Sequence, residues 1–410
     1  MTQSAIDLSD PAIWQNGFPH ETFTRLRNST PLFHHELTPG VAEQVQRDFW
    51  MCTKHRHALR IHRDTDAFTA TEGPVVQPLE TFDAYPSIIN MDPPDVNRRR
   101  KILSGAFTPR AIAKLEAGIR DRAKTMVDGL YEAGGGDWVT QVASELPMTV
   151  IGDIVGIPEA DRPVIFRLVE NIVKSKSPSS GISPDDEAGF YMEIFQYASA
   201  LTAEKRRNPV DDIWSALCIA GADGTDDAQY ALAQNELEMF FFVLSLAGGD
   251  TTRNALTAGL QAFVENPDQA ERYRRDEALR STAVEEVLRW TTPIIYWVRG
   301  AKSDVEIDGQ IIPAGSRVVA MLASANRDEE VFDNPFAFDI GRINNPHVAF
   351  GGGGPHYCLG AMLARAEIRA VFDELFGRDT MFILGDPIAT YPNLGLNMYV
   401  YEHLPIEFGA

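Results

Sequence analysis

The stretch from Phe350 to Gly360 reads Phe-Gly-Gly-Gly-Gly-Pro-His-Tyr-Cys-Leu-Gly. Its four consecutive glycines remove side chains from the backbone, so a flat and bulky group can approach the chain closely. The run then delivers Cys358 to an apolar segment from Ala361 that is predicted to be a helix. At the amino end of a helix, amide donors and the helix dipole favour a thiolate. Cys358 is therefore a candidate metal ligand or nucleophile.

Three other interpretations of this stretch stay open at this point. A buried structural cysteine beside a glycine loop is a common arrangement. A phosphate-binding loop is disfavoured because no Gly-Lys-Ser or Gly-Lys-Thr follows the glycines. A cysteine nucleophile with His356 as its base is disfavoured too, since a two-residue separation along a loop aims a base poorly at its neighbour. The rest of the chain has to decide between them.

Composition bounds the class of protein. The chain has 410 residues, 44% of them hydrophobic, which is enough for a large buried core. A formal charge of −21 argues against nucleic acid or an anionic membrane as a general partner. The three widely spaced cysteines suit a reducing cytoplasm without a disulfide framework. No apolar run of about 18 residues occurs, so we expect a soluble, cytoplasmic protein with no membrane span.

Hydrophobic periodicity and turn residues predict a mostly helical chain with short strands. The predicted helices span residues 19–29, 55–63, 109–173 (broken at 134–136 and 156–158), 235–265 and 281–290. The predicted strands span residues 48–52, 67–70, a hairpin at 305–315, and 394–401. Residues 72–90 contain Pro74, Pro78 and Pro86, so we expect an irregular, pocket-lining segment there. The polar, Ser- and Pro-rich residues 175–187 are predicted to form a mobile loop between two helices.

The predicted helix at 235–265 is apolar on all sides in its middle, which is typical of a central helix. Within it lies Ala247-Gly248-Gly249-Asp250-Thr251-Thr252, although each glycine costs about 1 kcal/mol in a helix relative to alanine. Small residues would let a ligand press against the helix, and paired glycines allow its hydrogen-bond ladder to widen. Asp250 and Thr251 side by side could pass protons. A bend with a satisfied polar pair is the alternative.

Charged residues give weaker signals. Residues 91–95 predict a turn that caps a helix carrying four adjacent cations at 98–101. Neighbours on a helix point about 100° apart, so at most one or two of these cations can face inward. A solvated run of charge is the other interpretation. Glu286 and Arg289, three residues apart on a predicted helix, indicate no more than a surface ion pair by themselves.

Taken together and in this order, these pieces resemble the cytochrome P450 family, the haem-thiolate monooxygenases, over essentially the whole chain. The resemblance implies a mainly α fold with a small β region, formed by a single domain of residues 1–410. Haem would lie between the long central helix and the helix after the cysteine loop. The β-rich part would fall mainly at residues 30–70, 295–320 and 385–408.

The resemblance also implies roles for individual residues. Cys358 would be the axial ligand of the iron, and such a thiolate favours cleavage of the O–O bond. Asp250 and Thr251 would be the acid and alcohol of the central helix that deliver protons. Glu286 and Arg289 would be a structural pair tied to the segment near Asn334 and Pro335. The remaining haem-binding residues implied by the resemblance are Arg100, Arg299 and His356 at the propionates, and Gly354, Gly360 and Ala247.

Two positions depart from the family pattern. Phe350 lies eight residues before Cys358 instead of the usual seven, so the loop has one extra residue. Val96 stands where many relatives place a histidine that contacts a propionate. The propionate site is therefore expected to rely on Arg100.

Within the family, the chain resembles the bacterial branch that hydroxylates sterol side chains and methyl-branched lipids. The resemblance is carried by residues 89–92, 105–110, 250–254, 326–332 and 346–348 together with the lengthened cysteine loop. It implies insertion of one oxygen atom from O2 into a C–H bond of a hydrophobic substrate. Two alternatives remain: a haem-thiolate protein that acts as a peroxygenase or only binds a ligand, and a cysteine-nucleophile hydrolase without haem.

The substrate pocket and the partners follow from this assignment. We expect the pocket walls to be apolar and to include Ile88, Val243, Leu244, Ala247, Gly248, Ile294, Ile295 and Leu396. No flavin or nicotinamide motif is present, so electrons from NAD(P)H are expected to arrive through a ferredoxin reductase and a ferredoxin. A basic patch on an otherwise acidic monomer would receive the ferredoxin, formed by Arg98, Arg99, Lys101, Arg365 and Arg369.

Overall fold

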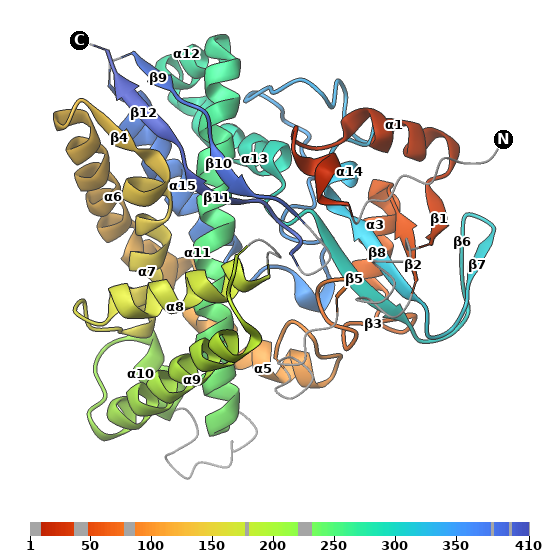
Figure 1. Ribbon diagram of the computed structural model, residues 1–410, viewed down its shortest axis with the longest axis horizontal. Coiled ribbons are helices and arrows are strands. Elements are labelled where there is room, and N and C mark those ends of the chain that lie inside the picture. The colour runs from red at the N-terminus through yellow and green to blue at the C-terminus, as the bar shows by residue number, and fades with distance from the viewer. Residues whose placement is uncertain are drawn as a thin grey trace.

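The structure is a computed structural model that describes residues 10–36, 48–77, 87–176, 180–219, 232–378, 381–392 and 396–409. Most of the helices gather around α11 (Gln234–Glu265), which runs through the helical part of the molecule (Figure 1). A mixed sheet lies on the right of α11 in this view (Figure 1). The strands near the C-terminus lie against the helical side (Figure 1). The mainly α fold with a small β region that the sequence predicts is confirmed.

The helices follow the predicted periodicity closely. They are α1 (His20–Ser29), α3 (His55–Arg63), α5 (Asp95–Leu103), α6 (Pro109–Glu132), α7 (Glu145–Val155), α8 (Arg162–Ser175), α9 (Pro184–Arg207), α10 (Ile213–Ile219), α11, α12 (Pro267–Arg275), α13 (Arg280–Thr291), α14 (Leu322–Ala325) and α15 (Ala361–Phe376). Local signals set several ends. The side chain of Thr108 accepts a hydrogen bond from the amide of Ala111 at the start of α6, and Gly156 ends α7 in a left-handed conformation.

The largest sheet has five strands in the order β1 (Leu32–His35), β2 (Phe49–Cys52), β8 (Arg317–Met321), β5 (Tyr296–Ala301) and β3 (Phe68–Thr69). Strands β2 and β8 are parallel, and the other neighbours are antiparallel. A second sheet consists of β4 (Gly135–Asp137), β12 (Pro405–Phe408) and β9 (Phe382–Leu384). Two further antiparallel pairs are β6 (Val305–Ile307) with β7 (Gln310–Ile312), and β10 (Ile388–Thr390) with β11 (Val400–His403).

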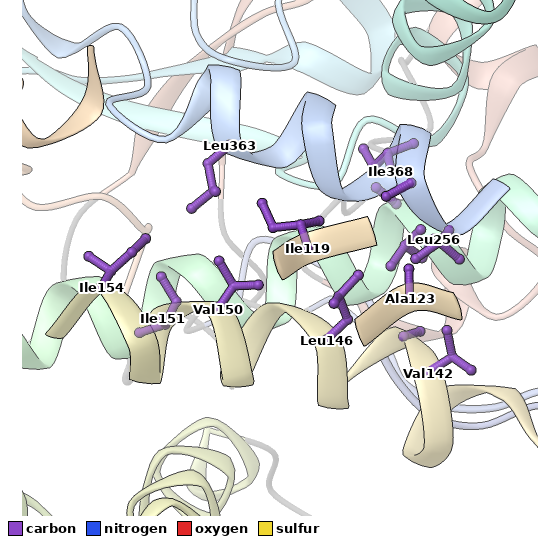
Figure 2. Close-up of a cluster of buried hydrophobic side chains, with 14 of the residues drawn as sticks. Ile119, Ala123, Val142, Leu146, Val150, Ile151, Ile154, Leu256, Leu363 and Ile368 are labelled. Carbon is purple, nitrogen blue, oxygen red and sulfur yellow. The ribbon is translucent and has the colours of Figure 1, made fainter. Parts of the chain in front are cut away.

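The main core lies where α6, α7, α11 and α15 meet. Figure 2 shows aliphatic side chains of α7, such as Leu146 and Val150, pointing toward Ile119 and Ala123 of α6. Leu256 of α11 and Ile368 of α15 complete this cluster, and both are fully buried. Since every such side chain gains about 1.5–3 kcal/mol on burial, this core fixes α11 and α15 relative to each other.

The glycine pair in α11 serves this packing. A Cβ atom added at Gly248 would lie 2.6 Å from Cδ1 of Ile151, and one added at Gly249 would collide with the sulfur of Met148. Both obstacles belong to α7, and α11 stays α-helical through this segment. The expected widening of the hydrogen-bond ladder is therefore wrong, and close approach of α7 explains the two glycines.

Other sequence predictions need correction or lie outside the described residues. The predicted loop at 175–187 is shorter, because Ser183 caps α9 through a capping box with Asp186. The predicted helical break at 134–136 is partly a strand, β4, which pairs with β12. Pro78 and Pro86, residues 177–179 of the predicted loop, and Leu394 of the predicted last strand region lie outside the described residues.

Glu286 and Arg289 are not a surface pair. Both side chains are completely buried, and a nitrogen of Arg289 lies 2.7 Å from a carboxylate oxygen of Glu286. Arg289 also donates to the carbonyl oxygens of Asn326, Pro335 and Ala337. The pair thus joins α13 to the irregular segment before the cysteine loop, as the family resemblance implies.

Candidate functional site

A large cavity separates α11 from the cysteine loop and α15. Cys358 and Gly360 line it on one side, and Ala247, Gly248 and Thr251 of α11 line it on the other. Its walls contain the predicted apolar residues Ile88, Val243, Leu244, Ile294 and Leu396. Ile295 is the exception, because it is fully buried in a separate cluster with Phe23 and Val298. The prediction that Ile295 faces the pocket is wrong, since alternate residues of an extended chain point to opposite sides.

Cys358 is exposed only in the sense that it opens onto this cavity, with protein on its other sides. Burial raises the pKa of the Cys358 thiol, and a hydrogen bond involving Gly360 and the charges of Arg100 and Arg365 oppose that shift without cancelling it. The two guanidinium charges thus favour the thiolate, and burial opposes them. A coordinating metal deprotonates such a thiol outright.

The glycines of the cysteine loop face two different neighbours. Gly351 lines the cavity. A Cβ atom on Gly352 would lie 2.9 Å from the carbonyl oxygen of Ala58, and one on Gly354 would press on the backbone of His62. Both obstacles belong to α3, so most of this glycine run lets the loop lie directly on α3 rather than on a ligand. Gly354, predicted to contact a cofactor, packs on α3.

Basic side chains meet at one end of the cavity. Arg100, Arg299, His356 and His62 all line it, and they come from α5, β5, the cysteine loop and α3. Burial lowers the pKa of Arg299 to about 10, and burial together with Arg299 and Arg100 lowers the pKa of His356 to about 4. Among the described residues that line the cavity, Glu367 alone is acidic. This end of the cavity therefore attracts an anionic group.

His62 was missed by the sequence analysis. It lies on the buried side of α3 next to Ala58 and Ile61, so a histidine at an apolar position of an amphipathic helix was the available signal. Its Nδ1 atom lies 2.7 Å from the carbonyl oxygen of Ala58. Its Nε2 atom is buried and has no hydrogen-bond partner among the described residues.

Asp250 and Thr251 occupy different environments. Thr251 lines the cavity, and its hydroxyl donates to the carbonyl oxygen of Ala247 over 2.9 Å. Asp250 is buried beside the cavity lining, and its carboxylate lies 2.8 Å from a guanidinium nitrogen of Arg253. Burial raises the pKa of Asp250 despite the opposing charge of Arg253. The other charges acting on Asp250 come from Glu170 and Lys174 of α8.

Glu367 is a second residue that the sequence analysis missed. It is buried in the cavity wall on α15, and Thr252 of α11 acts on its carboxyl group. Burial raises the pKa of Glu367 to about 8. A lone acidic residue between Leu363 and Ile368, on an otherwise apolar face, was the signal for this position.

The predicted basic patch is largely paired within the protein. Arg98 and Arg99 of α5 both contact the carboxylate of Glu236 at the start of α11. Arg365 makes two hydrogen bonds to Glu285, and Arg369 lies 3.4 Å from Asp373. Lys101 is exposed on α5. The positive charge of this surface is therefore smaller than the sequence suggests.

The lining of the cavity fits an anionic group that carries a metal ion. One thiol faces a small-residue stretch of a central helix across the cavity, and four basic side chains lie at one end. The two walls that the sequence predicts for haem are α11, which Met148 of α7 contacts, and α15, the helix after the cysteine loop. Fold and site together define a haem-thiolate protein.

Comparisons with known proteins support this class. The family model described as Cytochrome P450 matches residues 186–378. A steroid C26-monooxygenase of Rhodococcus jostii is 36% identical over 93% of this chain and 80% of its own length. A methyl-branched lipid omega-hydroxylase of Mycobacterium bovis is 39% identical over 86% of this chain and 83% of its own.

The structural comparison agrees. The structure of Mycobacterium marinum cytochrome P450 CYP268A2 in complex with pseudoionone matches with a TM-score of 0.89 and 37% sequence identity, covering 98% of both chains. This chain belongs to the cytochrome P450 family, whose cofactor is haem, and it is a monooxygenase. Among the residues that the structure describes, none of the helices has the length and apolar character needed to cross a membrane.

Proposed function

We propose that this enzyme hydroxylates a terminal or side-chain carbon of a methyl-branched lipid, an isoprenoid or a sterol. The observation that carries the proposal is the apolar wall of the cavity, to which α11, the end of α8 and the segment before α5 contribute. Its members are Ile88, Ile172, Val173, Phe242, Val243, Leu244, Leu246, Ile294, Leu396 and Met398. Such a wall binds a substrate mainly by removing apolar surface from water, at about 25 cal/mol per Å². The names of the two curated relatives point to the same substrate class.

Haem, when bound, supplies the activation of O2 for insertion into a C–H bond. We propose that the thiolate of Cys358 would hold its iron. Arg100, Arg299 and His356 would hold its carboxylates at the basic end of the cavity, where each of them lines the wall. Gly360 and Ala247 leave room on the two faces.

The protons needed for the reaction would move through α11. The Thr251 hydroxyl belongs to a residue of α11 that lines the cavity, and it donates to the carbonyl oxygen of Ala247. Asp250 precedes it on α11, and the partly exposed ion pair of Glu170 and Lys174 on α8 acts on the charge of Asp250. We assign Thr251 to hold a proton in the cavity and Asp250 to resupply it from outside. The apolar walls keep bulk water away from this route.

Electrons must come from a separate protein, and we propose a ferredoxin supplied by an NAD(P)H-dependent reductase. The proposed docking patch includes Lys101 of α5 and Arg365 of α15, and the charge of Arg365 acts on Cys358. Partner binding through opposite charges depends on exposed groups. Lys101 is exposed on α5, so we propose it as a direct contact.

An optical titration of the ferric protein tests the substrate class. A 3-keto sterol and an acyclic methyl-branched lipid are added separately, and the shift of the haem from low to high spin is recorded. A shift with the sterol supports a wide pocket and side-chain hydroxylation. A shift with the acyclic lipid alone supports a narrow channel and terminal hydroxylation. No shift with either ligand contradicts the proposed substrate class and leaves the family unaffected.

A further inference from the structure

The basic end of the cavity contains one group that the assignments above leave unused. The imidazole of His62 belongs to α3 and lies where α3 contacts Gly351 and Gly352 of the cysteine loop. A Cβ atom on Gly351 would lie 3.6 Å from the His62 ring, and a Cβ atom on Gly352 would lie 3.2 Å from its Cβ. The lengthened glycine loop thus holds this ring in place at the edge of the cavity.

The tautomer of His62 follows from its hydrogen bond. The carbonyl oxygen of Ala58 can only accept, so Nδ1 carries a proton across the 2.7 Å contact. In a neutral imidazole, Nε2 then has a lone pair and no proton. This atom is buried and has no partner among the described residues, and the residue to which it belongs lines the cavity. A buried polar atom without a partner is costly, which makes it a candidate for contact with a bound group.

The groups that face His62 are cationic or basic. Arg299 approaches from β5 and His356 from the cysteine loop, and both disfavour a proton on His62. Arg63, the next residue of α3, turns away and donates to the carbonyl oxygen of Gly352 over 2.6 Å. Burial and Arg299 together lower the pKa of His62 to about 3. A carboxylate placed among these groups reverses the sign of the local field.

We propose that Nε2 of His62 holds a carboxylate of the bound haem, and that His62 takes up one proton from solvent as the haem binds. The neutral ring cannot donate from Nε2, so contact with a carboxylate requires the imidazolium form. In that form Nδ1 donates to Ala58 and Nε2 donates to the haem carboxylate. Val96 supplies no polar group on α5, and His62 provides an imidazole from α3 instead. The proposal rests on haem binding and is independent of the choice of substrate.

The test measures the rate of haem transfer from the holoenzyme to an excess of apomyoglobin. His62→Leu is expected to lose haem roughly 10- to 100-fold faster than the wild type at pH 6, since a hydrogen bond between charged groups is lost. The imidazolium is present below its pKa in the holoenzyme and disappears as the pH rises. The ratio of the two rates is therefore expected to shrink to a few-fold by pH 9. His57→Leu is the matched control, because His57 lies on the same helix and contacts Asp308 instead of the cavity.

Two further measurements separate the proposed contact from simple packing. In protein reconstituted with haem dimethyl ester, which has no carboxylates, the wild type and His62→Leu are expected to lose the cofactor at equal rates. In His62→Gln, an amide donor needs no proton, so retention of normal haem is expected to be independent of pH. If His62→Leu does not fold, the proposal is tested by comparing how haem loss depends on pH in His62→Gln and in the wild type. Equal acceleration at both pH values, or with the diester, would overturn the proposal.

Discussion

At the scale of single residues, the hydroxyl of Thr251 is the simplest group to test. Replacement of Thr251 by Ala removes the proton-holding group from the cavity while leaving the apolar wall in place. We expect hydroxylated product per NAD(P)H consumed to fall at least about tenfold, because positioned proton transfer contributes roughly 10²–10⁴ to rates. Substrate affinity is expected to stay within about twofold.

A matched control exists on the same helix. Thr257 donates to the carbonyl oxygen of Arg253 over 2.8 Å, the same backward contact that Thr251 makes, and it does not line the cavity. Thr257→Ala should therefore leave the ratio of product to NAD(P)H unchanged. An equal drop in product per NAD(P)H in both variants would show that the hydroxyls stabilise the helix and that Thr251 does not deliver protons.

Glu367 gives a prediction about pH. Its pKa is raised from 4.5 to about 8 by burial, so the folded protein keeps a proton that the unfolded chain loses above about pH 4.5. The stabilising effect of this proton is complete below the unfolded pKa and is lost as the pH rises. Between the two values the free energy of unfolding falls by up to about 1.4 kcal/mol per pH unit.

Glu367→Gln removes this dependence because the amide is neutral throughout. We expect the variant to melt at a higher temperature than the wild type at pH 7.5, with the difference vanishing near pH 4.5, in thermal unfolding followed at the haem absorption band. Glu374→Gln, half-buried on the same helix, serves as control and should show no growing difference. A gain that is constant with pH would mean that Glu367 is ionised in the folded protein.

The sequence predicted which residues of the site carry chemistry better than it predicted their surroundings. Cys358, Thr251 and Arg299 could be found because motifs fix them along the chain, and the structure places all three on one cavity. His62 and Glu367 give a weaker signal, a polar residue on an apolar helix face, because the neighbours that each one meets at the cavity are far away in sequence. The glycine runs were misinterpreted for the same reason. Their spacing shows that something approaches closely, but not that the neighbours are α3 and α7.

At the scale of elements, α5 shows why adjacent charges differ in role. Its cations point in different directions, so Arg98 and Arg99 reach Glu236 while Arg100 reaches the carbonyl oxygen of Tyr357 over 2.6 Å. Lys101 lies on the exposed side. Reversing Arg99 would break the contact between α5 and α11, which makes Lys101 the cleaner position for testing partner binding.

Lys101→Glu is expected to slow reduction of the ferric enzyme by a ferredoxin about 3- to 10-fold at low ionic strength. The effect should weaken with added salt, since exposed charges are screened over about 10 Å at 0.1 M. Stopped-flow reduction kinetics provide the measurement. Arg207→Glu, which reverses an exposed charge on α9, should leave the rate unchanged. Identical reduction rates for Lys101→Glu and the wild type would reject α5 as part of the docking surface.

Most element boundaries could be predicted because propensity and tertiary packing agree. The helix at 55–63 and the long helix from 235 match α3 and α11 to within a residue. The strand β4 could not be predicted, because Gly135 and Gly136 have no side-chain pattern and become a strand only by pairing with Glu407 and Ile406 of β12. The helix α9 begins earlier than predicted, because the polar residues Ser183 and Asp186 form a capping box and do not continue the loop.

At the scale of the whole molecule, a buried ion-pair network joins the helical side to the segment that leads to the cysteine loop. Glu286 accepts from Arg289, from Arg342 and from the backbone amide of Asp339. Arg289 in turn donates hydrogen bonds to the carbonyl oxygens of Asn326 and Pro335, in the segment that leads to the cysteine loop. The sequence spacing of Glu286 and Arg289 is that of an ordinary surface pair, so only tertiary structure reveals their burial.

This network predicts that haem loading depends on a residue outside the haem cavity. Arg289→Ala leaves three carbonyl oxygens and part of the Glu286 charge buried without partners, which costs about 3–5 kcal/mol. We expect a lower melting temperature and a smaller fraction of protein with the carbon monoxide-bound thiolate absorption, because Cys358 follows the segment that Arg289 holds. Arg272→Ala is the matched control, since Arg272 and Asp339 are each more than two-fifths exposed and such pairs are worth at most about 1 kcal/mol. Normal haem loading with a lowered melting temperature in Arg289→Ala would show that the network stabilises the fold without positioning the cysteine loop.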